Sequence, residues 1–155
     1  MIGLLKGTVR NLRPAETILL TGGVGYLVSI PLSTYSLLCE GGEAELLIHT
    51  HVREDQIRLF GFHSASEKQI FELLLKVSGI GTSMALAILS GISADGFIDA
   101  VNTSRADLLV KIPGIGKTKA EKIIFELSRR DDFQRLCTTG GGAQRPTAGG
   151  DAIEA

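Results

Sequence analysis

The sequence has 155 residues, of which 44% are hydrophobic and 21% charged, a composition that excludes wholesale disorder. Its formal net charge is −1, so any attraction to a polyanion must come from a local basic patch. The length allows one medium domain or two small ones. The apolar runs are far shorter than the roughly 18 residues of a membrane-spanning helix, and none is expected.

Residues 1–63 have the pattern of a β-domain. Short apolar or alternating runs are separated by glycines and a proline, which turn the chain or end strands. Five or six such strands in about sixty residues predict a small closed barrel of the OB type. No element is assigned to PLSTYSLL, residues 31–38. The expected strands are 2–10, 17–20, 26–30, 45–52 and 57–62, and residues 53–56 form a hairpin tip between the last two.

The periodicity changes after residue 63. In 66–77, SEKQIFELLLKV, apolar residues recur at helical spacing after Ser66, a typical N-cap residue. Helical segments broken by glycine continue to about Arg130, and we expect one helical domain over residues 64–134. The segment 135–150 is rich in Gly, Thr and Ala and predicts a flexible linker. Residues 151–155 resemble the first turn of a further helix.

The helical part contains an internal repeat. Val77-Ser78-Gly79-Ile80-Gly81 recurs 35 residues later as Ile112-Pro113-Gly114-Ile115-Gly116, each time between two helices. Glycines allow a tight turn, and the helix that follows presents unpaired N–H groups and a positive dipole end, which suit a DNA phosphate. Two copies are too few for a solenoid, so a paired unit with a shared core is expected. A ligand-free helix connection is the alternative, which the lysines of the second copy disfavour.

The predicted contacts follow from this repeat. In the first hairpin they are Gly79, Ile80, Gly81, Thr82 and Ser83, and in the second they are Gly114, Ile115, Gly116, Lys117, Thr118 and Lys119.

Gly116-Lys117-Thr118 also suggests an ATP-binding loop. That motif needs a glycine, four further residues and then Gly-Lys-Ser/Thr, after a strand. Position 111 is lysine instead of glycine, and residues 106–112 have a helical pattern. The sequence therefore predicts no nucleotide site and no other cofactor.

Cysteine and histidine spacing is uninformative about metals. Cys39 and Cys137 lie far apart without a signal-peptide pattern, so we expect no disulfide and a cytoplasmic location. His49 and His51 would share one face of a strand but have no nearby third ligand, so no metal site is predicted.

Four features occur together: MIGLLKGTV, GGVGYLVSIP, HVREDQIRLFGF and the two Gly-Ile-Gly repeats. In this order they resemble the RuvA family of bacterial proteins, which bind four-way Holliday junctions in recombination, repair and the SOS response to DNA damage. The resemblance covers residues 1–130. It implies an OB-type barrel followed by an all-α domain with two helix-hairpin-helix motifs.

The resemblance also implies an assembly and its partners. A homotetramer, or an octamer of two tetramers, would hold the junction open and square without a catalytic site of its own. RuvB, a hexameric ATPase, would drive branch migration, and a junction-resolving endonuclease would be a further partner. Glu54 and Asp55 would form an acidic pin near the crossover, with a phosphate contact from Arg53.

The sequence departs from the family in two places. Members often carry a lysine near Ser83, where this chain reads Gly81-Thr82-Ser83-Met84. Members also continue past the linker into a third helical domain that docks on the motor, of which residues 151–155 would be the opening. A chain ending there would be expected to bind junctions but not to stimulate the motor.

Other function classes remain open. Helix-hairpin-helix pairs also occur in DNA glycosylases, ligases and nucleases, and in generic duplex-binding modules. A glycosylase would need a catalytic residue beyond the hairpin in a base-flipping pocket. The acids there are Glu121, Glu126, Asp131 and Asp132, which lie on the hairpin's own helix or next to the linker, without an aromatic wedge. An enzyme is therefore less favoured, and a protein-interaction adaptor is the third class.

Overall fold

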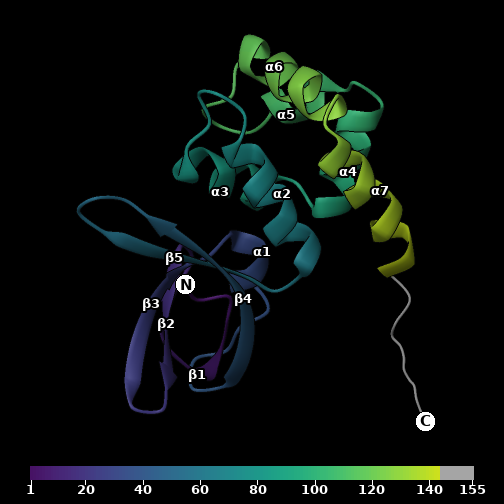
Figure 1. Ribbon diagram of the computed structural model, residues 1–155. Helices are drawn as coiled ribbons and strands as arrows, with labels where there is room; N and C mark the ends of the chain where they lie inside the picture. Colours follow the sequence, from purple (N-terminus) through teal and green to yellow (C-terminus); the bar gives the residue numbers. More distant parts are fainter. Residues whose placement is uncertain (144–155) are drawn as a thin grey trace.

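The computed structural model describes residues 1–143, which form a β-barrel and a layer of helices packed against one end of it (Figure 1). The strands close in the order β1-β2-β3-β5-β4, and only β3 and β5 pair in parallel. The predicted OB-type barrel is thereby confirmed. Its strands are β1 (Leu4–Arg13), β2 (Glu16–Thr21), β3 (Val24–Ser29), β4 (Glu43–Val52) and β5 (Ile57–Phe62).

Apolar side chains at alternating strand positions fill the interior of the barrel. Leu5 and Val9 of β1 point inward and meet Leu19, Val28, Ile30, Leu46 and Ile48 in a single buried cluster. Gly61 of β5 lies where the barrel interior is crowded, since a Cβ there would lie 2.6 Å from Val28 Cγ1. A glycine is needed at this position because neighbouring side chains already occupy the space.

A one-turn helix that the sequence analysis did not predict, α1 (Leu32–Tyr35), joins the barrel to the helices. The Leu32 N–H donates to Ser90 Oγ at 2.9 Å, and Ser33 Oγ donates to the buried Glu67 at 2.7 Å. The buried Thr34 accepts a hydrogen bond from the His63 N–H. Four residues are too few to show a helical period, so only these long-range contacts reveal the element.

The helical part shares its core with the end of the barrel. Phe60 and Phe62 of β5 pack against Phe71, with ring centroids 5.0 Å apart in both pairs. Ser64, and not the expected Ser66, is the N-cap of the first long helix and accepts from the Glu67 N–H. The helices are α2 (Ala65–Leu75), α3 (Thr82–Gly91), α4 (Ala94–Asn102), α5 (Ala106–Val110), α6 (Lys117–Ser128) and α7 (Asp131–Ala143).

A polar contact reinforces this junction between the two parts. His49 Nδ1 of β4 lies 2.9 Å from Glu72 Oε2 of α2, and Lys68 Nζ lies 3.2 Å from the same oxygen. Burial raises the pKa of Glu72, but the hydrogen bonds from His49 and Lys68 outweigh it, so the net pKa is lowered. His49 therefore has a partner on α2, and this contact adds to the aromatic packing between the barrel and the helices.

Helix α7 lies where a flexible linker was predicted, so that prediction is wrong for part of the segment. The helix runs to Ala143 and so covers residues 135–143 of the segment expected to be flexible. Phe133 and Leu136, three residues apart, are 0% and 4% exposed in the helical core, and this buried face stabilises a helix that its composition does not favour. The rest of the expected linker, 144–150, and the expected helix start at 151–155 lie outside the described residues.

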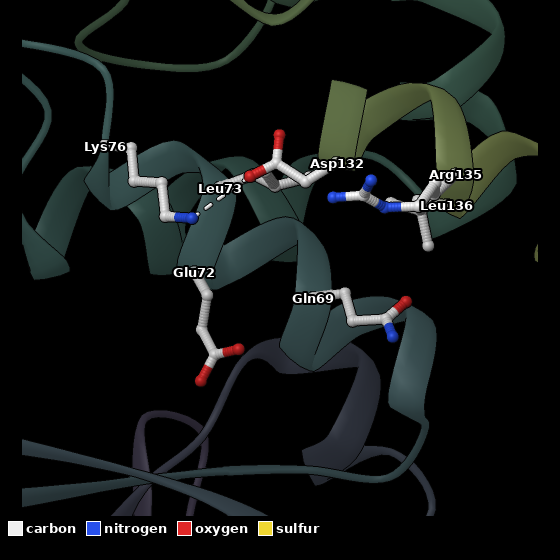
Figure 2. Close-up of a pocket in the computed structure, with 7 residues that line it drawn as sticks. All are labelled: Gln69, Glu72, Leu73, Lys76, Asp132, Arg135 and Leu136. Carbon is white, nitrogen blue, oxygen red and sulfur yellow. Dashed lines mark hydrogen bonds and ion pairs between the residues drawn. The ribbon is translucent and has the colours of Figure 1, made fainter. Parts of the chain in front are cut away.

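Charged side chains hold α7 against α2 beside a hollow of about 240 Å³ (Figure 2). Lys76 Nζ lies 3.1 Å from Asp132 Oδ2, and Arg130 Nε lies 3.0 Å from Asp132 Oδ1. The hydrogen bond from Arg130, followed by that from Lys76, lowers the pKa of Asp132 from 3.8 to about 2.

This shift predicts a pH-dependent contribution to stability. A depressed carboxyl pKa stabilises the fold above the unfolded value near 3.8, and the contribution disappears as the pH falls through about 2. Because the pair lies at the surface, we expect Asp132→Asn to lower the free energy of unfolding by only about 1 kcal/mol at pH 7. Urea denaturation at pH 7 and pH 2 measures the difference from wild type, which should be several-fold smaller at the lower pH. Asp131→Asn is the matched control, and an equal loss in both variants would contradict the role of the Asp132 pair.

Candidate nucleic-acid interface

The first repeat is a turn between α2 and α3. Gly79 has a φ of +89°, in the left-handed region that glycine adopts without strain. The Ile80 N–H donates to the Val77 carbonyl at 3.1 Å, and the Ala85 N–H donates to the Gly81 carbonyl at 3.0 Å. Gly81 is the N-cap, with extended backbone and no capping side chain, so the first N–H groups of α3 are not satisfied by a cap.

The second repeat, between α5 and α6, has the same local geometry. Gly114 has a φ of +92°, and the Ile115 N–H donates to the Ile112 carbonyl at 3.1 Å. The Ala120 N–H donates to the Gly116 carbonyl at 3.0 Å, and Gly116 is again an N-cap without a side-chain bond. The duplication seen in the sequence is therefore also a duplication in structure.

The two helix starts differ in charge. Helix α6 begins with the exposed Lys117 and Thr118 followed by the half-buried Lys119, whereas α3 begins with Thr82 and Ser83. A helix start with open N–H groups and flanking lysines is suited to bind an anion such as a backbone phosphate. The second hairpin carries these cations within its own sequence.

Two of the predicted contact residues have a different role. The side chains of Ile80 and Ile115 are 6% and 4% exposed, and their N–H groups are already bonded to Val77 and Ile112. Neither residue has a side chain or donor left for DNA. They anchor the two turns in the core, which leaves the flanking glycines, hydroxyls and lysines facing solvent.

A contact between the hairpins adds a residue that the sequence analysis did not select. Lys122 Nζ of α6 donates to Ser78 Oγ of the first turn at 2.6 Å. Lys122 follows Lys119 by three residues and shares its face of the helix, which is the sequence signal that could have identified it. The bond links the two hairpins into one unit with three lysines along α6.

The predicted pin lies at the tip of the β4–β5 hairpin, which extends beyond the barrel in Figure 1. Arg53, Glu54 and Asp55 are all exposed there, and the Arg53 N–H closes the turn on the Gln56 carbonyl at 2.9 Å. The structure thus places both carboxylates at a projecting tip. Their effect on DNA stays a prediction.

A hollow of about 450 Å³ lies between the outer part of this hairpin, including Arg53 and Gln56 of its tip, and the first hairpin of the repeat. His51 and Arg58 face it, and neither was selected from the sequence. They are cross-strand partners of β4 and β5, so strand alternation alone could have placed them together. Burial lowers the pKa of His51, and the positive charges of Arg53 and Arg58 lower it further, together with His49. The hollow is lined by His51, Arg53, Gln56, Arg58, Gly81, Thr82, Ser83 and Met84.

Residues 1–143 were compared with the requirements of a metal site and of a membrane-spanning helix. Within them, no three His, Cys, Asp or Glu side chains lie close enough together to hold a metal ion. In the same range, no single helix has the length and apolar composition to cross a membrane. Within this range, the pair α3 and α4 has the required length and apolar composition when the two helices are taken together, but their axes are bent by 98° relative to each other. Both cysteines are free thiols.

Comparison with known proteins agrees with this geometry. Residues 1–61 match the family described as RuvA N terminal domain, and residues 71–129 match the SAM-like Helix-hairpin-helix tandem. Relatives that match most of this chain carry the name Holliday junction branch migration complex subunit RuvA. The protein of Solibacter usitatus is 48% identical over 128 residues, which are 82% of this chain and 65% of the relative. The protein of Delftia acidovorans is 47% identical over 128 residues, 82% of this chain and 67% of the relative.

The protein of Coxiella burnetii, strain RSA 331, is 45% identical over 140 residues, 89% of this chain and 68% of the relative. The chain therefore spans about two thirds of the length of these relatives. Both parts of the structure, the closed barrel and the paired hairpins, match the family in chain order. This chain belongs to the RuvA family of Holliday junction branch migration complex subunits.

Proposed function

We propose that this chain binds four-way DNA junctions by shape, without reading base sequence. The observation that carries the proposal is the pair of hairpins with matching backbone geometry, each ending in an uncapped helix start. The names of the relatives, which describe a Holliday junction branch migration complex subunit, support it. Donors of this kind bind phosphates and not base edges, so affinity depends on salt and not on sequence.

The proposed mechanism needs several copies of the chain. Four copies around a four-fold axis would each apply two hairpins to one arm and hold the junction open and square. Two such tetramers could enclose it as an octamer. Light scattering with and without junction tests the stoichiometry, and a monomer in both states would contradict this part of the proposal.

The motor that moves the junction would be a separate hexameric ATPase of the RuvB type, with a junction-resolving endonuclease as a later partner. In this chain the Gly-Lys-Thr sequence begins helix α6 after the helical α5, and not after a strand. That context differs from an ATP-binding loop and supports a non-catalytic role. Since junctions form on the chromosome, the proposal places the chain in the bacterial cytoplasm, acting in recombination and repair.

A direct comparison of DNA substrates tests the function. Gel-shift titrations at moderate salt would compare a synthetic four-way junction with linear duplex of equal length. Strong preference for the junction supports the proposal, and equal binding supports the alternative of a generic duplex-binding module. Absence of binding to either would favour an adaptor, and a nicked or base-released product would favour a repair enzyme.

The acidic tip provides a prediction within this function. Glu54 and Asp55 would meet their copies near the crossover and repel phosphates there, which helps to separate strands. We expect Glu54→Gln with Asp55→Asn to bind a junction at least as tightly as wild type, because a repulsive interaction is removed. Branch migration with the partner motor should be slowed or less ordered. Glu43→Gln with Glu45→Gln, on strand β4, is the charge-matched control. A clear loss of junction affinity in the tip variant alone would argue against the pin.

A further inference from the structure

The hollow between the β4–β5 hairpin and α3 combines two sources of positive potential. Arg53 and Arg58 line it from the barrel, and Thr82 and Ser83 line it from the uncapped start of α3. Arg58 and Ser83 also both line a neighbouring hollow of about 480 Å³, so they stand between the two. Residues far apart in the sequence thus form one surface where barrel and helices meet.

Arg58 is held in place without a counter-charge. Its guanidinium lies over the ring of the fully buried Phe60, 4.9 Å from the centroid, and its Nη2 lies 3.5 Å from Ser29 Oγ. Within residues 1–143, neither Arg58 nor Arg53 forms an ion pair with a carboxylate. Both arginines contribute to the lowered pKa of His51, as expected where positive charge is uncompensated. A planar guanidinium in this position can bind a phosphate through two parallel N–H bonds.

The repeat shows that the first hairpin lacks the cations of the second. The 35-residue offset aligns Thr82 with Lys117 and Met84 with Lys119, so the first hairpin has the backbone of the second but not its lysines. Opposite its helix start, the barrel provides arginines instead.

We propose that Arg58, assisted by Arg53, is the cationic contact for a DNA backbone phosphate at the first hairpin, the role that Lys117 and Lys119 have at the second. This rests on the proposed function, since it assigns a further residue to the same interface. The first hairpin is then a composite site, built from the barrel and α3 together. Its strength depends on how the two parts are docked.

Charge-removing and charge-keeping variants of Arg58 test the assignment. Arg58→Gln should weaken binding of a four-way junction about 5- to 10-fold at moderate salt and reduce the slope of log Kd against log salt by about one. Arg58→Lys should retain the salt slope, which depends on charge, and should weaken binding less than Arg58→Gln, because lysine keeps the charge but cannot form two parallel N–H bonds. Arg129→Gln is the matched control, because Arg129 also stacks on an aromatic ring, with its guanidinium 4.4 Å from the Phe125 centroid, at the opposite end of α6 from Lys117.

A rescue variant separates charge from packing. Adding Thr82→Lys to Arg58→Gln places a lysine where the second hairpin has Lys117, and we expect it to restore the salt slope. Equal weakening by Arg58→Gln and Arg58→Lys, without rescue, would overturn the assignment because it would indicate lost stacking on Phe60. If Arg58→Gln binds like wild type while Lys117→Ala binds more weakly, this inference fails and the proposed function stands. Failure of wild type to bind a junction would overturn both.

Discussion

Replacing both lysines at the start of α6, Lys117→Ala with Lys119→Ala, should weaken four-way junction binding by one to two orders of magnitude at moderate salt. Each lysine that neutralises a phosphate releases condensed counterions and contributes about 0.9 to the slope of log Kd against log salt. The slope should therefore fall by about two. Fold stability should change little, because alanine is a better helix former than lysine and Lys117 is exposed. Fluorescence anisotropy over a series of salt concentrations measures both quantities.

A charge-matched control separates this local effect from a change in net charge. Lys6→Ala with Arg10→Ala removes two exposed cations from β1, in the barrel and away from the hairpins (Figure 1). We expect that variant to retain the wild-type salt slope. Equal slopes for the two double variants would show that α6 has no specific role in phosphate binding.

The two hairpins could be predicted because their geometry is local. A left-handed glycine, an apolar anchor and an N-cap glycine lie within five residues, and the same pattern 35 residues later confirms the interpretation. The sequence pattern could not distinguish a residue that contacts DNA from one that anchors the turn in the core. Ile80 and Ile115 look like part of a binding motif, but only the packed core shows that their side chains and N–H groups are used internally.

The barrel was predictable from strand count and alternation, but the composite surface beside α3 was not. Arg58 and Ser83 are 25 positions apart in the sequence and become neighbours because α1 and the Phe60–Phe62–Phe71 cluster dock the helices onto the barrel. That element has four residues, too short to leave a periodic signal. Non-local contacts of this kind depend on the whole fold.

Helix α7 shows the opposite error, in which composition was given too much weight. Thr- and Gly-rich segments generally have low helix propensity, so a linker was expected from residue 135. Phe133 lies just before this segment and Leu136 lies within it, and their burial on one face overrides the propensity. Tertiary packing of one apolar stripe provides most of the stability of such a helix.

Substitutions of the two glycines in the second hairpin should separate the effect on turn stability from the effect on DNA binding. Gly114 has a φ of +92°, where a side chain is strained, so Gly114→Ala should lower the free energy of unfolding by about 1–2 kcal/mol. Gly116 has a φ of −90°, and a Cβ there would meet no atom within 4 Å, so Gly116→Ala should cost only about 0.5–1 kcal/mol, the preference for glycine over alanine at an N-cap. The two positions have the same residue type but differ in backbone conformation, and only a Cβ at Gly114 would contact a neighbour, Met84 Cε at 3.6 Å.

Junction binding should rank these variants differently. An alanine Cβ at Gly116 occupies the open space beside the N–H groups of α6, where a phosphate must approach closely, so affinity should fall several-fold although the fold is intact. Thermal melts and junction titrations on the same samples test both expectations. Gly81→Ala gives the corresponding measurement at the first hairpin, where the N-cap is equally open. If Gly116→Ala keeps full affinity, the DNA backbone does not approach the start of α6, and the phosphate contact must be assigned to the lysine side chains alone.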